Sequence, residues 1–351
     1  MNRRQLLKAG LALPFAVTGG AETWAASPIF IGDMHYHLFF KGRHPAASNP
    51  LAQTMARGNA TLVAWSVVGD LLWMGMGPRG FEQKSVPKPG ETVAWFRAEL
   101  ERAKAHIAEQ GLKIARTPAD IDRALEGDPH VVLAVEGASF LDADIAEVQA
   151  AYDLGVRHIQ LVHYIRNAIG DFQTEPPRHG GLSEHGRKVI QECNRLGILV
   201  DLAHSTPEAV TQALTVSTVP VVWSHSSVTR TRTPRHTLPA WQARQLSLDG
   251  AKAIAAKGGV VGLWALRTDV GQSVEDYGNR LAETADWLGE DHVAFGTDMN
   301  GLLAPVITGY ADLRRVVEGW QRRGMDEARI RKIAIENYAR VLRAAMAARQ
   351  A

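Results

Sequence analysis

Eight apolar runs of strand length, separated by amphipathic stretches of helix length, dominate this 351-residue chain. The runs read as near-continuous Val, Ile, Leu and Ala, which is typical of strands buried on both faces of a parallel sheet. Helical patterns such as 91–111, 183–197 and 274–289 lie between them, and each of these three ends at a glycine. This alternation predicts one α/β domain, a (β/α)8 barrel of the TIM type. The predicted strands are residues 30–34, 61–68, 131–135, 158–162, 198–203, 219–224, 259–264 and 293–297.

Six side chains that can bind metal ions or act as acids follow five of these runs. The carboxyl ends of barrel strands meet at one rim, which is where the active sites of such barrels lie. One histidine after an apolar run is ordinary, but six such residues on one predicted rim indicate a metal centre. They are His35, His37, Glu136, His204, His225 and Asp298.

The chemistry of these residue types suits hydrolysis by two metal ions. His35 and His37 are two residues apart, so on an extended strand their imidazoles point to the same face and form a chelate. The two oxygens of Glu136 can bridge two cations that share a hydroxide. Asp298 is suited to take a proton from the attacking water and pass it to a departing amine. A turn or helix N-cap role is the alternative for Asp298.

The N-terminus is typical of a twin-arginine export signal, because Arg3 and Arg4 precede a short apolar stretch. We predict a signal at residues 1–26, a metallohydrolase domain at residues 27–351, and a periplasmic or secreted location. The signal holds three basic residues and one acidic one, so its removal cancels the formal net charge of +2. A near-neutral mature chain gives no electrostatic reason to expect nucleic acid or an anionic membrane as a partner. The apolar stretch is shorter than the roughly 20 residues that span a bilayer.

Three further features of the sequence lead to structural predictions. The only cysteine, Cys193, lies in a helical pattern, excludes an internal disulfide and is expected to be a small buried residue. Residues 69–89 read as the longest irregular connection, either a substrate lid or a packed loop at the barrel mouth. Residues 326–346 are expected to form a helix outside the barrel. The subunit number stays open, with a homodimer as one option.

Several segments resemble the membrane (renal) dipeptidase family of zinc peptidases. They are GVRHIQLVHYIRNAIGDF, PPRHGGLSEHGRKVIQECNRLGILVDLAHST, WSHSS, FGTDMNG and ENYARVLR, and the resemblance extends from about residue 31 to 343. The combination of VDLAHS with WSHSS is specific to this family. The resemblance implies a barrel with two zinc ions that hydrolyses dipeptides and tolerates a D-residue on the carboxyl side.

The resemblance also implies roles for individual residues. His35 corresponds to a ligand of one metal ion, Glu136 to the carboxylate shared by both, and His204 and His225 to ligands of the second. The family normally places Asp two residues after the first His, whereas this chain has His37. A neutral nitrogen donor in place of a carboxylate leaves the centre more positive and shifts its preference toward softer metals.

Two roles in substrate binding follow in the same way. His163 corresponds to a donor that hydrogen-bonds the carbonyl oxygen as it becomes an oxyanion, with a structural histidine packed on Tyr164 as the alternative. An arginine in the loop after His225 would bind the substrate carboxylate through two parallel hydrogen bonds. Arg235 is the first choice because the family tends to have an Arg followed by Asn, and Arg230 and Arg232 are the other candidates.

These observations favour an exported metallopeptidase that hydrolyses a small peptide with two divalent ions, expected to be zinc. One alternative keeps the metal barrel but changes the substrate to a modified peptide or a cyclic amide of secondary metabolism. Another is a catalytically inactive periplasmic accessory protein. The sequence contains no Gly-x-Ser-x-Gly elbow and no phosphate-binding loop, which argues against a serine hydrolase or a nucleotide enzyme.

Overall fold

Eight parallel strands form the centre of the computed structural model, which describes residues 28–38, 50–230 and 239–350. The pairing order is β1-β2-β6-β7-β8-β9-β12-β13, and each strand overlaps one of the eight predicted runs, with β1 ending two residues later and β7 beginning two residues earlier than predicted. A short strand β5, Lys113–Ile114, also pairs with β6. The eight strands are β1 Ile31–Tyr36, β2 Ala60–Val68, β6 His130–Glu136, β7 Val156–Gln160, β8 Leu199–Asp201, β9 Val222–Trp223, β12 Val260–Leu263 and β13 Val293–Phe295.

The first and last strands meet and nearly close the sheet into a barrel. The backbone N–H of Asp298 donates to the carbonyl oxygen of His35 at 3.1 Å, and that of His37 donates to Met299 at 3.0 Å. Below this seam, Asp33 Oδ2 accepts a hydrogen bond from Thr297 Oγ1 at 2.6 Å. The predicted (β/α)8 fold is therefore confirmed.

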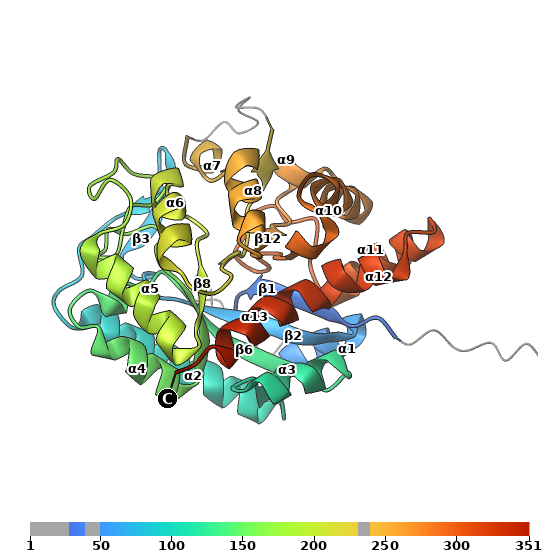
Figure 1. Cartoon of the computed structure of the whole chain (residues 1–351), viewed down its shortest axis with the longest axis horizontal. Helices are drawn as coiled ribbons and strands as arrows, with labels where there is room; N and C mark the ends of the chain where they lie inside the picture. The colour runs from blue at the N-terminus through green and yellow to red at the C-terminus, as the bar shows by residue number, and fades with distance from the viewer. Residues whose placement is uncertain (1–27, 39–49, 231–238, 351) are drawn as a thin grey trace, which may run out of the picture.

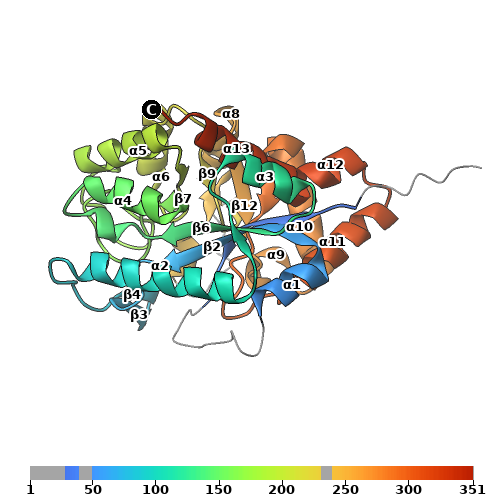
Figure 2. The ribbon, with the colours of Figure 1, turned by 90° about the horizontal axis from the view of Figure 1, so that it is seen from below.

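Helices lie on the outside of the strands (Figures 1 and 2). Several begin at a Ser or Thr whose hydroxyl accepts the backbone N–H three residues later, as at Ser183, Thr206, Ser247 and Ser273. The helices are α1 Leu51–Gly58, α2 Glu91–Glu109, α3 Pro118–Leu125, α4 Ala146–Leu154, α5 Glu184–Leu196, α6 Pro207–Val216, α7 Pro239–Ala243, α8 Leu248–Ala256, α9 Arg267–Val270, α10 Val274–Leu288, α11 Tyr310–Arg322, α12 Glu327–Arg331 and α13 Asn337–Ala347, with short 3-10 turns at Ser139–Leu141 and Glu290–His292 and a π turn at Lys332–Glu336.

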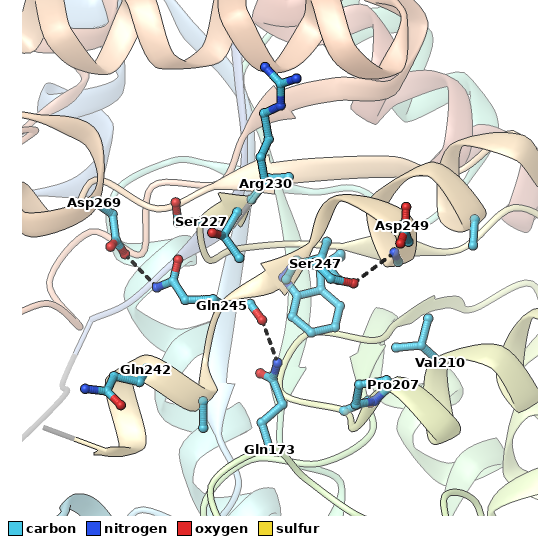
Figure 3. A pocket seen from close by; sticks show the side chains of 18 of the residues that line it. Gln173, Pro207, Val210, Ser227, Arg230, Gln242, Gln245, Ser247, Asp249 and Asp269 are labelled. Atoms are coloured by element: carbon cyan, nitrogen blue, oxygen red, sulfur yellow. Dashed lines mark hydrogen bonds between the residues drawn. The ribbon is translucent and has the colours of Figure 1, made fainter. Parts of the chain in front are cut away.

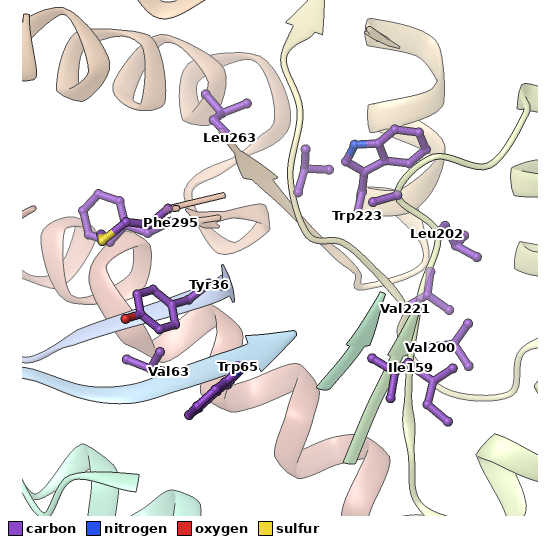
Figure 4. Close-up of a cluster of buried hydrophobic side chains, with 14 of the residues drawn as sticks. Tyr36, Val63, Trp65, Ile159, Val200, Leu202, Val221, Trp223, Leu263 and Phe295 are labelled. Carbon is purple, nitrogen blue, oxygen red and sulfur yellow. The ribbon is translucent and has the colours of Figure 1, made fainter. Parts of the chain in front are cut away.

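The main core fills the space between the strands and these helices. It includes the outward-facing strand residues Val63, Trp65, Ile159, Trp223 and Phe295, which Figure 4 shows among the buried side chains. Burying a large side chain of this kind contributes about 1.5–3 kcal/mol relative to leaving it exposed. Cys193 is fully buried in this core on α5, as predicted.

A second apolar cluster closes the amino-terminal mouth of the barrel. Inward-facing strand residues such as Met34, Ala64 and Leu199 pack against Tyr338 and Leu342 of α13. This helix contacts β1, β7, β8, β12 and β13 and crosses the barrel in Figure 1. The predicted C-terminal helix is present as α12, the π turn and α13, and α13 covers the mouth opposite the carboxyl-terminal rim.

The connection after β2 contains more regular structure than the sequence indicated. Strands β3 Met74–Gly77 and β4 Gly80–Gln83 pair as an antiparallel hairpin, so the prediction of an irregular stretch was wrong. The hairpin forms because Trp73 and Met74 bury themselves against Val68 and Ile165, a long-range contact that the local sequence does not show. Strands β10 Val228–Thr229 and β11 Leu246–Ser247 form another small pair at the carboxyl-terminal rim. Among the described residues, no helix combines the length and hydropathy that crossing a bilayer would demand.

Candidate metal centre

The carboxyl-terminal rim brings all six predicted metal-site residues together. His37 directly follows β1, Glu136 is the last residue of β6, and Asp298 comes after β13. His204 and His225 follow β8 and β9, and His35 is the penultimate residue of β1. The four histidines and Glu136 are each at most 2% exposed, and Asp298 is 8% exposed. Five segments far apart in the sequence therefore supply one buried polar cluster.

The Glu136 carboxylate lies at the centre of this cluster. Its Oε1 lies 3.4 Å from His35 Nε2, 3.3 Å from His204 Nε2 and 3.5 Å from His225 Nε2. Its Oε2 lies 3.4 Å from His37 Nε2 and has no hydrogen-bond partner among the described residues. A buried carboxylate oxygen without a hydrogen bond is costly, so this arrangement fits a bound cation better than a hydrogen-bonded network.

Contacts behind the histidine rings prepare them to bind metal. His37 Nδ1 lies 2.9 Å from the carbonyl oxygen of Ser66, which only accepts, so Nδ1 carries the hydrogen and Nε2 presents a lone pair to the cluster. Ser224 Oγ lies 2.9 Å from His225 Nδ1 and 3.3 Å from His35 Nδ1. The Nε2 atoms form two close pairs, His35 with His37 at 3.0 Å and His204 with His225 at 3.2 Å. Each pair of nitrogens faces one point, as a chelate requires.

The electrostatics favour the protonation states that a metal ion needs at His204, His225 and Glu136, whereas at His37 burial lowers the pKa but Asp298 and Glu136 outweigh it and raise it. Burial, together with neighbouring positive charge, holds the pKa values of His204 and His225 well below their ordinary range. Burial raises the pKa of Glu136, but His163 and His35 outweigh it and hold that pKa well below its usual range. Neutral imidazoles around an ionised carboxylate are the metal-binding forms of these side chains.

Three groups of potential ligand atoms are compact enough to hold an ion, because the atoms of each lie within 4.8 Å of one another. Nitrogen and carboxylate donors of this kind suit zinc and neighbouring divalent metals. The groups are His35, Glu136 and His225; His35, His37 and Asp298; and Glu136, His163 and His204.

The predicted oxyanion donor, His163, also lies in the cluster. Its Nε2 is 3.4 Å from Glu136 Oε1, and its ring packs on Tyr164 with centroids 4.4 Å apart. Its Nδ1 lies 2.6 Å from Oδ1 of Asp70, a residue that the sequence analysis did not single out. Asp70 lies two residues after an apolar run, and this is the same signal that led to the predicted metal ligands, so it could have identified Asp70 as well.

Among the described residues, Arg244 is an arginine that contacts the cluster, and the sequence analysis did not single it out. Arg244 is fully buried, with one terminal nitrogen 3.0 Å from His225 Nε2 and the other donating to Gln173 Oε1 at 2.8 Å. The family tends to have an Arg followed by Asn, and Arg244 is followed by Gln245, an amide one methylene longer than Asn. This similarity is the sequence signal that could have identified Arg244. Arg230 is exposed, with its guanidinium 5.4 Å from the Trp287 ring centroid, and does not line the metal cavity. Arg232 and Arg235 lie outside the described residues.

Arg244 borders one cavity, and its hydrogen-bond partner Gln173 lines a second one. The metal cavity measures about 40 Å³ and is bordered by aromatic and leucine side chains, including Phe81 of the β3–β4 hairpin. The second cavity measures about 870 Å³ and is lined by Gln173, Gln245 and Arg230 (Figure 3). Gln173 Nε2 donates to the carbonyl oxygen of Gln245 at 3.3 Å, so hydrogen bonds connect Arg244 of the metal cavity with two residues of the second cavity.

Comparison with known proteins agrees with this arrangement. Residues 54–351 match the model of the membrane dipeptidase family, peptidase family M19. Dipeptidase tcpJ of Claviceps purpurea is 30% identical over 306 residues, which cover 82% of this chain and 67% of that protein. An uncharacterized protein in the pqqA 5' region of Klebsiella pneumoniae is 30% identical over 275 residues, 74% of this chain and 98% of that protein.

Solved structures share the fold. A metallo peptidase from Rhodobacter sphaeroides, liganded with a phosphinate mimic of the dipeptide L-Ala-D-Ala, has a TM-score of 0.73 at 22% identity and covers 90% of this chain and 99% of its own. The probable dipeptidase PvdM of Pseudomonas aeruginosa has a TM-score of 0.73 at 18% identity, with 91% and 96% covered. With the buried ligand cluster, these matches show that this chain belongs to the membrane dipeptidase family, peptidase family M19, and is a metal-dependent hydrolase of peptide bonds.

Proposed function

We propose that this protein is an exported dipeptidase that uses two divalent metal ions, with zinc as the expected metal. The observation that carries the proposal is the Glu136 carboxylate: its Oε1 faces Nε2 of His35, His204 and His225 and its Oε2 faces Nε2 of His37, all at 3.3–3.5 Å. A carboxylate shared in this way suits two cations on either side of it. His35 and His37 would hold one ion, and His204 and His225 the other. Two such ions would activate the attacking water and polarise the peptide carbonyl.

Asp298 is the residue best placed to handle the proton of that water. It is the most exposed of the six cluster residues, and its Oδ1 lies 3.2 Å from His37 Nε2. Its backbone has a left-handed φ of 52°, an uncommon conformation for a residue other than glycine, held by the seam contact with His35. From this position Asp298 would accept a proton from the attacking water and return it to the departing amine.

His163 and Arg244 would bind the substrate. Burial lowers the pKa of His163, but the charges of Asp70 and Glu136 outweigh it, so the net shift is upward and favours a protonated donor for the developing oxyanion. Arg244 would bind the carboxylate of the dipeptide, the role predicted for Arg235 or Arg230, because its guanidinium borders the metal cavity. Burial raises the pKa of Tyr164, which borders the same cavity, to about 12, so its hydroxyl stays protonated.

The substrate is expected to be a dipeptide, with a D-residue accepted on the carboxyl side. The small metal cavity supports a short substrate, and the relative from Rhodobacter sphaeroides binds a mimic of L-Ala-D-Ala. Export rests on residues 1–26 alone, which lie outside the described residues. Replacing Arg3 and Arg4 by Lys should keep the protein in the cytoplasm, as cell fractionation would show.

The direct test combines metal analysis with activity on a panel of L-Xaa-D-Xaa and L-Xaa-L-Xaa dipeptides. We expect about two metal equivalents in the wild type and a clear loss in His204→Ala. His292→Ala is the matched control, because His292 precedes β13 at the opposite end of the strand from the metal rim. Negligible metal in both wild type and His204→Ala would refute the proposal. A fully loaded protein without activity on the panel would refute the dipeptide substrate and leave the metal site standing.

A further inference from the structure

Asp70 lies where the chain leaves β2, on the same rim as the metal cluster, and is fully buried. The backbone N–H of Gly69 donates to the carbonyl oxygen of Glu136 at 2.8 Å. A Cβ atom on Gly69 would collide with the carbonyl group of Gly137, so no other residue fits there without backbone movement. The ends of β2 and β6 therefore pass in direct backbone contact, and this contact sets the Asp70 carboxylate beside His163.

Both oxygens of the Asp70 carboxylate accept hydrogen bonds, three in total. Oδ2 accepts from the backbone N–H groups of Tyr164 at 2.9 Å and Ile165 at 3.1 Å. Oδ1 lies 2.6 Å from Nδ1 of His163. An ionised carboxylate only accepts, so the hydrogen in this contact belongs to Nδ1 of His163. The opposite ring nitrogen, Nε2, then points at Glu136 Oε1, 3.4 Å away.

We propose that Asp70 is a positioning residue that fixes the orientation of His163 and keeps a hydrogen on its Nδ1. The inference rests on the proposed function, in which His163 Nε2 is the atom that faces the substrate carbonyl. With Nδ1–H held by Asp70, the ring cannot flip without leaving a buried carboxylate oxygen unpaired. The negative charge of Asp70 also stands behind the ring when Nε2 carries a hydrogen toward the substrate. This is the arrangement in which a carboxylate orients an imidazole for work at its other nitrogen.

The substitution Asp70→Asn tests this because the structure dictates which way the amide turns. The two backbone N–H groups of Tyr164 and Ile165 need an acceptor, so the amide oxygen takes the place of Oδ2. The NH2 group then faces His163 Nδ1 and can only donate. In a neutral ring, Nδ1 must therefore become the acceptor and the hydrogen must move to Nε2.

Proton and nitrogen NMR of metal-loaded protein labelled at histidine reads this tautomer directly. We expect a downfield, exchange-protected Nδ1–H signal in the wild type that is lost in both Asp70→Asn and His163→Gln. The kcat of Asp70→Asn should fall by about 10- to 100-fold, the usual effect of removing such a partner, with KM changed less than about threefold. Metal content should remain that of the wild type.

Asp120→Asn is the matched control. The Asp120 carboxylate also accepts backbone N–H groups, those of Arg116 and Thr117, and faces a histidine, His130, at 3.8 Å. His130 begins β6, whereas Glu136 ends it, so this pair lies at the other mouth of the barrel. Asp120→Asn should lower stability but leave kcat and the His163 signal unchanged.

Two outcomes would overturn the proposal. One is an Asp70→Asn protein that keeps the Nδ1–H signal or has a kcat within about twofold of wild type. The other is a loss of metal or thermal stability in Asp70→Asn with unchanged kcat per bound metal, since that would mean a purely structural role. If the wild type cleaves no dipeptide, the proposed function fails, but the NMR comparison still decides whether Asp70 fixes His163.

Discussion

His37 Nε2 lies 3.2 Å from Asp298 Oδ1, although the two residues come from opposite ends of the barrel sheet. Their backbones meet at the seam, where His37 N–H donates to Met299 and Asp298 N–H donates to His35. The same contacts that close the barrel therefore bring a proposed metal ligand after the first strand beside the proposed base after the last one. The backbone hydrogen bonds that stabilise the seam therefore also set the geometry of the site.

His37 should determine the metal preference of the site. His37→Ala is expected to lose about one of two metal equivalents, because one imidazole of the chelate is gone. His37→Asp, which restores the aspartate usual in this family, should keep both equivalents. Its hard oxygen donor should shift the preference from Zn²⁺ toward Mn²⁺. Competition between the two metals, followed by elemental analysis, measures the shift, and an unchanged Zn²⁺ to Mn²⁺ ratio in His37→Asp would contradict the prediction.

Asp298→Asn should keep the fold and most of the metal but lose turnover. An amide at this position cannot accept the proton of the attacking water, so we expect kcat to fall by about 10²- to 10⁴-fold with a small change in KM. Steady-state kinetics normalised to bound metal is the measurement. Asp312→Asn, at the first turn of α11, serves as the control. Near wild-type kcat in Asp298→Asn would exclude it as the base.

Arg244 should recognise the substrate carboxylate. Arg244→Lys keeps a positive charge but loses the two-pronged donor, and should reduce kcat/KM for a dipeptide by the equivalent of about 2–4 kcal/mol. The same variant should lose little on a dipeptide amide, which has no carboxylate. Arg230→Ala should behave like the wild type on both substrates, because Arg230 lines the other cavity. Equal losses on acid and amide would assign Arg244 a structural role instead.

Asp142 should make stability depend on pH. Burial raises the pKa of Asp142 to about 6 from its ordinary value of 3.8. The folded state therefore holds this proton more tightly than the unfolded state, and the free energy of unfolding falls as pH rises from about 4 to 6. Asp142→Asn should match the wild type near pH 4 and exceed it by up to about 3 kcal/mol above pH 7.

Denaturation with urea at pH 4, 5, 6 and 7.5 measures this difference. The amide oxygen can still accept the hydrogen bond that Asp142 Oδ1 takes from Ala168 N–H at 2.9 Å, so the exchange removes mainly the buried charge. Parallel pH profiles for the two proteins would show that Asp142 does not titrate in this range.

Much of the fold could be predicted because its strands and helices follow from local patterns of apolar residues. Parallel strands buried on both faces need continuous apolar runs, and all eight barrel strands overlap such runs. The rim residues could be identified for the same reason, since the end of each strand is visible in the sequence. His35, Glu136 and His225 needed no knowledge of the tertiary structure beyond the rule that strand ends meet.

Other contacts could be known only from the tertiary structure, because they join segments whose local sequence gives no sign of the pairing. Arg244 lies in a link between α7 and β11 and reaches His225 only because that link folds over the rim. The pairing of Asp70 with His163 spans 93 residues, and the β3–β4 hairpin depends on packing against Tyr164 and Ile165. Sequence periodicity reports which face of one element is buried, whereas these contacts depend on which elements become neighbours once the barrel closes.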